Sequence, residues 1–482
     1  MFDLRPVGYV TGLLVAALGV TMLLPMLVDL YYQNGHWPIF LESAVLSSVI
    51  GTVTAVACAN SVRQKLTIQQ TFLLTTGVWL MLPVFGAIPF LLGEPDARVV
   101  DAFFEAMSGL TTTGSDVFAG LEQLPEGVLV WRSMLQWFGG VGIIVVAMVF
   151  LPELRVGGMQ IFRSESFDTD GKVLPRAAQI AARISVVYFV LTVACFIAYL
   201  AVGIPGFDAA NHALTTIATG GFSTFDASFG AMKGPGEYVA TLFMAIASLP
   251  FVRYVQLLGG ASGPLLRDAQ VRGFLWTLGV LYTVVWFYQV AGLGTPVEPA
   301  LRETLFNVTS ILTGTGYAST DYQLWGPFPV VLFFFIGLIG GCAGSTTCSI
   351  KVFRYQLLIA SVRAQIRKIH SPHGVFTPRY DGRPVGEDVL NSVMVFFVAF
   401  VVSLGVISVL LAVTGLDTIT SLSGAAAALA NIGPGLGPVI GPAGNFASLS
   451  DTAKWILSAA MLLGRLEIMA VFAILTVNFW RV

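Results

Sequence analysis

Ten stretches of the chain are each long and apolar enough to cross a lipid bilayer as a helix. Such a helix needs about 20 mainly apolar residues, because each residue adds about 1.5 Å to a span of roughly 30 Å. Charged residues make up only 11% of the 482 residues, against about 25% in soluble domains. We therefore expect an all-α polytopic membrane protein. The predicted spans are 8–30, 39–60, 71–92, 130–151, 179–203, 237–258, 272–294, 327–350, 388–415 and 453–479.

The composition and motifs exclude other classes of protein. The formal net charge is −2, so the chain lacks the strong positive charge of a nucleic-acid-binding protein. Its four cysteines show no CxxC pairing and mostly lie in apolar stretches, which favours buried thiols. Neither HExxH nor GxSxG occurs, which argues against an intramembrane enzyme. The first stretch lacks a cleavage site, so we interpret it as a span rather than a signal peptide.

The basic residues predict which side of the membrane each connection faces. Lysine and arginine gather in cytoplasmic connections, and most of the 25 lie on the side of the two termini. We therefore expect both termini in the cytoplasm. The opposite connections are mainly acidic, and such a face attracts cations. Their only basic residues are Arg98, Arg132, Lys233, Arg302 and Lys454.

Four outer connections share one unusual pattern. Those after the third, fifth, seventh and ninth spans begin with a helix-like stretch too short to cross a bilayer, and then break at glycine. The breaks recur about every hundred residues, which indicates a repeated unit of span, half-helix, glycine loop and span. A single Thr/Gly-rich turn would carry no such meaning. The final glycines are Gly114, Gly220, Gly316 and Gly433.

The glycine loops predict a path for a cation. Non-helical backbone at membrane depth is tolerated only where it is buried in protein or lines a water-filled path. Four loops around one axis would present carbonyl oxygens that replace the hydration shell of a cation. Glycine permits the positive φ this requires, and each half-helix would point its partially negative C-terminus there. No carboxylate lies among the Thr/Gly residues of the loops, so a monovalent alkali cation fits better than Mg²⁺ or Ca²⁺.

These motifs resemble the TrkH branch of the Trk/Ktr/HKT potassium-uptake superfamily. The matching segments are Thr111–Ser115, Ala218–Ser223, Phe306–Val308 with Thr315–Tyr317, and Ala430–Gly435, and the two extra leading spans are typical of that branch. The resemblance implies two N-terminal helices followed by four pseudo-symmetric pore repeats around a central pore. The implied units are a two-helix domain, 1–65; pore repeats 66–155, 156–262, 263–355 and 387–482; and a cytoplasmic loop, 356–386.

By this resemblance, the carbonyl groups beside the four glycines coordinate K⁺. K⁺ is then the transported ion, with Rb⁺ and Na⁺ as further candidates, and the chain binds no cofactor. In the fourth loop Ile432 precedes the glycine and Pro434 follows it, and unequal loops predict weaker selectivity than a fourfold-identical filter. The implied filter residues are Thr112, Thr113, Gly114, Ala218, Thr219, Gly220, Gly314, Thr315, Gly316, Asn431, Ile432 and Gly433.

The eighth predicted span is rich in glycine and makes a poor continuous helix, since each interior glycine costs about 1 kcal/mol relative to alanine. One interpretation is small-residue packing between helices; the other is a broken span that forms an intramembrane loop beneath the filter. The family has a gating loop here, which favours the second. The implied gating residues are Gly340, Gly341, Gly344, Ser345, Thr346 and Thr347.

Arg465 lies near the middle of the tenth predicted span. A charge at that depth is costly and faces a pore, a partner or water. A structural ion pair and a positive barrier in the pore are both open interpretations; the family carries an arginine here that restrains permeation. Glu467, two positions on, would point to a different helix face. Lys351 and Glu467 are further candidates for gating.

The segment 351–387 after the eighth span carries seven basic residues with His370 and His373, and we interpret it as a solvated loop. The family docks on nucleotide-binding regulatory subunits of the TrkA type and forms homodimers in the bacterial inner membrane. The chain has no dinucleotide-binding fingerprint, so nucleotide sensing requires a partner. A symporter that couples K⁺ to H⁺ or Na⁺ is an alternative that the sequence does not distinguish.

Overall fold

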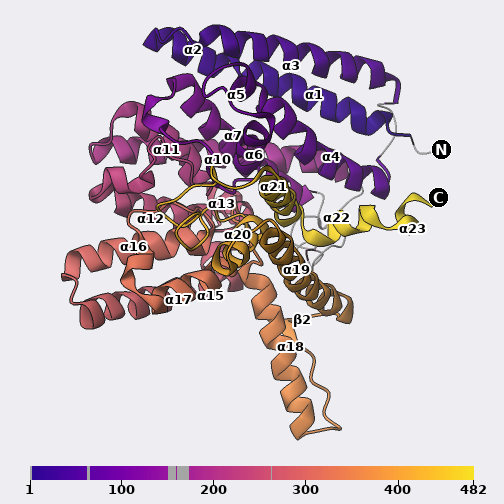
Figure 1. The fold of residues 1–482 in the computed structure, drawn as a ribbon. Helices are drawn as coiled ribbons and strands as arrows, with labels where there is room; N and C mark the ends of the chain where they lie inside the picture. Colours follow the sequence, from indigo (N-terminus) through magenta and orange to yellow (C-terminus); the bar gives the residue numbers. More distant parts are fainter. Residues whose placement is uncertain (1–2, 62–65, 150–158, 160–172, 262, 482) are drawn as a thin grey trace.

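The structure, a computed structural model, describes residues 3–61, 66–149, 159, 173–261 and 263–481. The described part is helical almost throughout (Figure 1). The domain boundaries predicted at 65, 155 and 262 lie outside the described residues, as do the basic residues Arg155, Arg163 and Lys172.

Seven helices of the described part are long and apolar enough to cross a membrane, and two further pairs would each do so as one bent span. The remaining predicted span begins as the short apolar helix α17. The chain is therefore a polytopic α-helical membrane protein, as predicted. The seven spans are α1 (Arg5–Thr21) with α2 (Leu23–Tyr32), α3 (Trp37–Cys58), α4 (Ile68–Gly86) with α5 (Ile88–Leu92), α7 (Glu126–Val149), α10 (Val173–Ala201), α15 (Ala269–Phe287) with η5 (Tyr288–Gly292), and α19 (Glu387–Val413).

The sixth and tenth spans were wrongly predicted to be continuous. The sixth bends by 89° near Pro250, which has no N–H to continue the helical hydrogen bonds. The tenth bends by 109°, where Glu467 takes a positive φ of 61°. Hydropathy does not detect either bend, because the residues on both sides are apolar. The helices concerned are α12 (Pro235–Ala247) and α13 (Phe251–Leu258), and α21 (Asp451–Arg465) and α22 (Ile468–Leu475).

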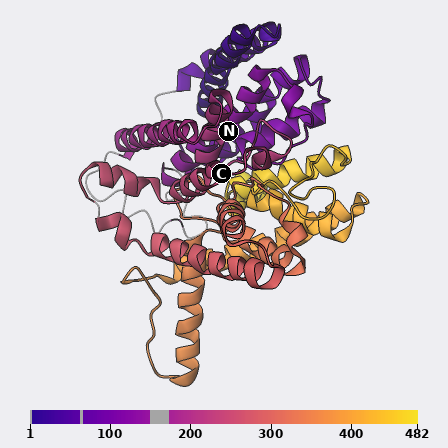
Figure 2. The ribbon, with the colours of Figure 1, turned by 90° about the vertical axis from the view of Figure 1, so that its left-hand side faces the viewer.

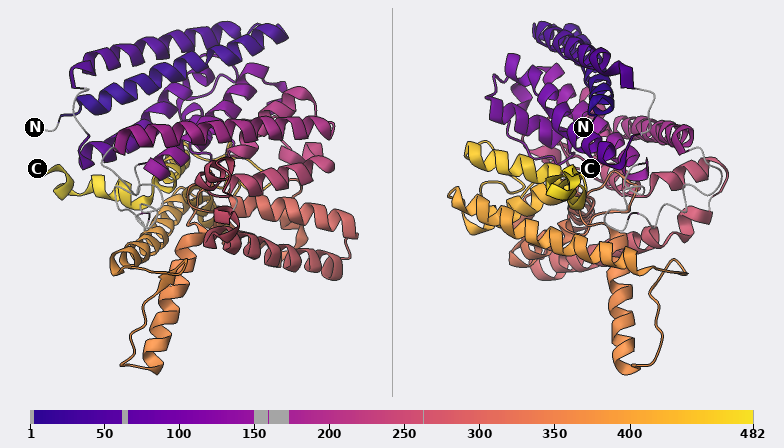
Figure 3. Two further views of the ribbon diagram at one scale, coloured as in Figure 1. Left: turned by 180° about the vertical axis from the view of Figure 1, so that it is seen from behind. Right: turned by 90° about the vertical axis from the view of Figure 1, so that its right-hand side faces the viewer.

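The N-terminal helices α1 and α3 form an antiparallel pair that lies along α4 (Figures 1 and 3). Glycine allows their backbones to touch: a Cβ added to Gly12 would lie 2.7 Å from the backbone nitrogen of Ala55. Close backbone approach supplies the van der Waals contact that holds helices together in lipid.

Four short helices occupy the centre and confirm the predicted half-helices. Each packs between the span before it and the span after it. Each also contacts the neighbouring repeat, in the pairs α6–α21, α11–α7, α16–α12 and α20–α17, so the repeats close into a ring. In Figure 2 the four repeats follow one another around the centre in chain order, and the fourth repeat lies beside the first. The half-helices are α6 (Val99–Leu110), α11 (Gly206–Ile217), α16 (Val297–Thr313) and α20 (Thr418–Ala430).

Helix α18 (Val352–His370) projects away from the helical body (Figures 1, 2 and 3). The expectation of a loop over 351–387 was wrong for this helix. Lys351 and Arg354 at its start are buried, whereas His370 and His373 are exposed. The remaining elements are α17 (Pro327–Gly337), α14 (Gly263–Arg267), α23 (Val477–Trp480), η1 (Ala59–Ser61), η2 (Leu121–Gln123), η4 (Ser228–Met232), η6 (Tyr322–Trp325), and the antiparallel strands β1 (Arg379–Tyr380) and β2 (Arg383–Pro384).

Candidate functional site

The loops that follow the four half-helices share one backbone conformation. In each loop two residues, two positions apart, take a positive φ, which favours glycine. The first has a φ between 49° and 72°, and the second, always glycine, has a φ between 81° and 101°. The four pairs are Thr112 and Gly114, Thr219 and Gly221, Gly314 and Gly316, and Asn431 and Gly433.

Backbone hydrogen bonds repeat in the same register. The residue between the two positive-φ positions donates its N–H to the carbonyl oxygen five residues earlier, at 2.8 or 2.9 Å in all four loops. These bonds tie each loop to the last turn of its half-helix. The donors are Thr113, Gly220, Thr315 and Ile432, and the acceptors are Ser108, Thr215, Ser310 and Ala427.

This conformation corrects the predicted register of the second loop. Gly221, and not Gly220, is the glycine with a positive φ. The carbonyl groups equivalent to those of the other loops are then those of Thr219 and Gly220, so Ala218 lies one position too early. The sequence misled because Thr219-Gly220 imitates the Thr-Gly step of the first and third loops, while the conformation requires the next glycine.

Neighbouring loops interlock through the second glycine of each pair. A Cβ added at any of the four would lie less than 3.0 Å from the carbonyl oxygen of the next loop, a distance that real Cβ atoms do not show. The fourth loop contacts the first, so the backbone forms a closed ring. The contacts are Gly114 with Gly220, Gly221 with Thr315, Gly316 with Ile432, and Gly433 with Thr113.

Side-chain support of the ring is unequal. Gln136 on α7 donates its Nε2–H to the carbonyl oxygen of Gly220 at 2.6 Å, and its Oε1 accepts the N–H of Phe222 at 3.0 Å. No side chain in the described part of the chain donates to the equivalent carbonyl of Thr113 or Ile432. The second loop is therefore held by a polar side chain that these loops lack.

The first and fourth loops are joined directly. The Ser115 hydroxyl donates to the carbonyl oxygen of Gly433 at 2.9 Å. The Asn431 amide donates to the Thr113 hydroxyl at 2.9 Å and to the carbonyl oxygen of Met461 at 3.0 Å. The fourth loop, which departs most from the Thr-Gly pattern, thus closes the ring through its asparagine.

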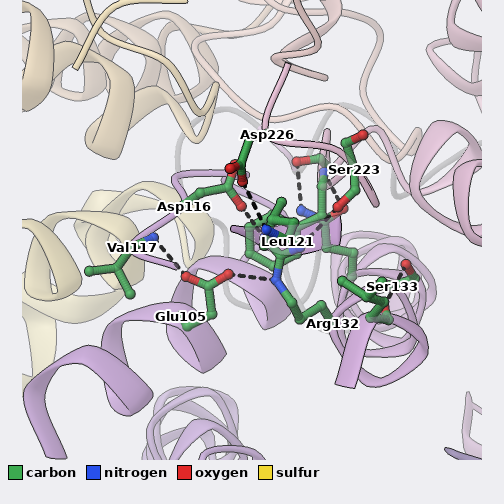
Figure 4. A network of polar contacts seen from close by, with 12 residues as sticks. Glu105, Asp116, Val117, Leu121, Arg132, Ser133, Ser223 and Asp226 are labelled. Carbon is green, nitrogen blue, oxygen red and sulfur yellow. Dashed lines mark hydrogen bonds and ion pairs between the residues drawn. The ribbon is translucent and has the colours of Figure 1, made fainter. Parts of the chain in front are cut away.

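A buried ionic cluster joins the first and second loops (Figure 4). Arg132 on α7 donates its Nε–H to Glu105 at 2.7 Å and pairs through Nη2 with Asp116. Its Nη1 donates to the carbonyl oxygen of Ser223 in the second loop at 2.9 Å. The other oxygen of Glu105 accepts the N–H of Val117 in the first loop at 2.8 Å. One guanidinium therefore holds the two loops at a fixed separation.

Arg132 and Glu105 are buried, since their side chains are 1% and 0% exposed. Burial is tolerated because each charge has an opposite charge and further hydrogen bonds. The remaining outer basic residues also pair with outer acids, which neutralises part of the predicted acidic field. The hydrogen bond that Arg98 donates to the carboxylate of Asp101 raises the pKa of Arg98. The other pairs are Lys233 with Glu303, Arg302 with Glu237 and Glu298, and Lys454 with Asp101.

The glycine-rich segment after α17 forms a loop, residues 338–351, so the eighth span is broken as predicted. Gly340 and Gly344 take positive φ values of 78° and 74°. The Thr346 hydroxyl donates to the carbonyl oxygen of Ala247 and accepts the hydroxyl of Thr219, both at 3.1 Å. The loop thus touches the ring through Thr219. Gly340, Gly341, Gly344, Ser345, Thr346 and Thr347 are all buried.

The bend of the sixth span holds this loop in place. A bend leaves helical N–H and C=O groups without partners, and in a membrane they must be satisfied by protein. The carbonyl oxygen of Ser248 accepts the N–H of Cys342 at 3.0 Å, and the N–H of Phe251 donates to Gly344 at 2.9 Å. The backbone groups left free at the bend therefore form hydrogen bonds with backbone groups of the broken span.

Arg465 is the last residue of α21 and is 2% exposed. Its Nη2 donates to the carbonyl oxygen of Gly139 at 2.7 Å, and its Nη1 contacts Cys348 and the carbonyl oxygen of Thr346. Its guanidinium lies 5.3 Å from the centre of the Trp79 ring. No carboxylate in the described part of the chain pairs with it. Arg465 instead joins elements of three repeats.

Glu467 pairs with Arg354 rather than with Arg465. Arg354, in the first turn of α18, is fully buried and lies 3.7 Å from the centre of the Phe396 ring. Lys351, at the end of the loop, is 5% exposed. The start of the projecting helix is thus fixed to the bend that follows Arg465.

Residues 36–479 match the TrkH family, described as cation transport proteins. The chain belongs to the TrkH family. It is 40% identical to the Trk system potassium uptake protein TrkI of Halomonas elongata, over 99% of this chain and 97% of that protein. It is 37% identical to TrkH of Escherichia coli, over 99% of both. The crystal structure of the potassium transporter TrkH from Vibrio parahaemolyticus is similar with a TM-score of 0.92, at 34% identity and covering 100% of both chains.

TrkH-family proteins are transporters rather than enzymes, as expected for this chain. The sequence analysis did not identify two polar residues that support the site. Gln136 on α7 donates to the ring, and the Oε1 of Gln270 accepts the N–H of Ala343 in the loop 338–351 at 2.8 Å. Polar residues within apolar spans are rare and usually face the protein interior, and that signal could have found Gln136. Gln270 lies just before the predicted seventh span, among charged residues, and carries no such signal. No comparable signal marks Arg354, which follows a polar segment.

Proposed function

We propose that this chain conducts K⁺ across a membrane through the ring of four loops. The observation that carries the proposal is the closed ring, in which four loops of one conformation each place a glycine against the carbonyl of the next. Carbonyl oxygens in such a ring replace water around a dehydrated cation. The four half-helices end at the ring, where their partially negative C-termini favour positive charge.

A monovalent ion suits the chemistry of the ring. The ring residues carry no carboxylate, which hard divalent cations require. The relatives are named potassium uptake proteins, which supports K⁺ over other alkali cations. The carbonyl of Gly220 already accepts a hydrogen bond from Gln136, so the four coordinating positions are not equivalent. We therefore expect incomplete discrimination between K⁺ and Na⁺.

The same proposal assigns gating to the loop 338–351 and Arg465. A fixed positive charge near a narrow path raises the barrier to a cation. Arg465 is held by Gly139 on one side and by Thr346 and Cys348 of the loop on the other. Opening therefore requires the loop and the arginine to move together. Glu467 would contribute by fixing α18 through Arg354.

Regulation, assembly and location complete the proposal. We assign the chain to the bacterial inner membrane, as a homodimer with both termini in the cytoplasm. The start of α1 and helix α23 lie at the same end of the molecule (Figures 1 and 3), which supports that orientation. Helix α18 ends in Arg367, Lys368 and His370 and projects far enough to meet a TrkA-like nucleotide-binding subunit.

Rubidium uptake into liposomes that contain only the purified protein tests conduction. We expect passive Rb⁺ flux that follows its electrochemical gradient and is competed by K⁺. Accumulation against that gradient, driven by H⁺ or Na⁺, would instead identify the symporter. No alkali-cation flux, with or without the regulatory subunit, would refute the proposal. Gly279→Ala is a matched neutral control, because a Cβ there meets nothing within 4 Å.

A further inference from the structure

A cavity of about 440 Å³ lies between α1, α4 and α7 and also reaches Ser185 of α10. Its wall is almost entirely apolar and includes Leu14, Val78 and Phe138. All three helices belong to membrane spans, and Leu14 is 40% exposed. The wall is therefore continuous with the surface that faces lipid.

The hydroxyl groups in the wall give water little to bind. The Thr21 hydroxyl donates to Leu18 at 2.6 Å, and those of Thr75 and Ser185 donate to carbonyl oxygens of their own helices at 2.9 Å. Apolar cavities without free polar partners stay dry, and even one of about 150 Å³ takes up benzene or xenon. An empty space would leave the wall without dispersion contacts. Between membrane spans, the apolar molecules available to fill such a cavity are the hydrocarbon chains of the bilayer lipids.

The same cavity reaches the residues that hold Arg465. Trp79 and Gly139 both line it, and both contact the Arg465 guanidinium. Leu110, the last residue of half-helix α6, lines it as well. A molecule in the cavity therefore touches the support of the arginine and of the first loop.

We propose that an acyl chain of a membrane phospholipid occupies this cavity and packs against Trp79. A flexible, unbranched hydrocarbon chain suits the shape of a gap between helices that is open to the bilayer. Its binding is independent of whether the protein conducts K⁺, so the two proposals fail separately.

Phospholipid vesicles test the site, using phosphatidylcholine that carries bromine at the middle of its acyl chains. Bromine quenches tryptophan fluorescence on contact. The contribution of Trp79 is the difference between each protein and the same protein with Trp79→Phe. We expect the Trp79 signal of the wild type to fall at least twofold. An unquenched Trp79 would overturn the proposal.

A cavity-filling variant makes the test specific. A Cβ on Gly142 would lie 3.6 Å from the Trp79 ring, an ordinary contact, so Gly142→Leu extends into the cavity. Val145→Phe, also in the wall, serves if that variant does not fold. We expect either to restore most of the Trp79 fluorescence, while Gly279→Leu on exposed α15 does not. Equal quenching in filled and control variants, or quenching only by brominated free fatty acid, would refute a phospholipid site.

Discussion

Replacing Glu105 by glutamine tests the buried cluster that joins the first two loops. The variant keeps the shape of the side chain but turns an amide towards Arg132, which is 1% exposed. Removing one partner of a buried ion pair costs about 3–5 kcal/mol when the other charge is left without compensation. Asp116 still pairs with Arg132 in this variant, so we expect a loss near the lower end of that range. The Asp116 side chain is 30% exposed, so water partly screens its charge, and Asp116→Asn should cost less than Glu105→Gln. The two variants remove the same charge from the same arginine and differ in burial.

Thermal unfolding of the purified proteins in one detergent, followed by tryptophan fluorescence, measures the difference. Glu105→Gln should melt clearly below the wild type, and Asp116→Asn closer to it. The double variant Glu105→Leu with Arg132→Met should lose less than Glu105→Gln alone, since apolar replacement of both partners removes the stranded charge. Equal melting temperatures for the two single variants, or a lower one for Asp116→Asn, would refute the assigned burial.

Four further predictions concern the ring and the gate. Arg465→Ala should raise Rb⁺ flux about tenfold, equivalent to about 1.4 kcal/mol off the barrier; unchanged flux in folded protein would count against the barrier. Gly221→Ala should abolish flux, because the positive φ of 82° and the carbonyl oxygen of Thr315 leave no room for a Cβ. In Gly220→Ala the Cβ meets only the flexible side chain of Gln136, so this variant should retain part of the flux. Glu467→Gln should lower the melting temperature by removing an acidic partner of the buried Arg354, unless Arg354→Met accompanies it. Reversal potentials should show a preference for K⁺ over Na⁺ that is incomplete, and near-perfect discrimination would contradict the unequal ring.

The spans, the half-helices and the four loops could be predicted because each depends on a local property of the sequence. Apolar length identifies a span, and a glycine that ends a short apolar helix identifies a break. The bends at Pro250 and Glu467 depend also on partners distant in the chain, such as Cys342 on the broken span and Arg354. Hydropathy averages over such positions and reports one continuous span.

The register of the second loop and the positions of the charges show the same limit. Choosing Gly221 over Gly220 requires the φ angles, because both follow Thr219. Arg354 was placed in a solvated loop because it belongs to a segment rich in basic residues, and Arg132 was counted only as a basic residue of the outer connections. Their burial depends on Glu105 and Glu467, which approach only in the folded chain.

The closed ring is built from one polypeptide, and this allows a single arginine to stand beside it. In a channel assembled from four identical subunits, any residue near the axis occurs four times. Four guanidinium groups gathered there would repel one another strongly in a medium of low dielectric constant, so such a design could not carry Arg465. Fusion of the repeats lets mutation alter one quarter of the ring at a time. Arg465, Asn431 and Gln136 could each arise in a single repeat while the backbone conformation shared by the four loops stayed the same.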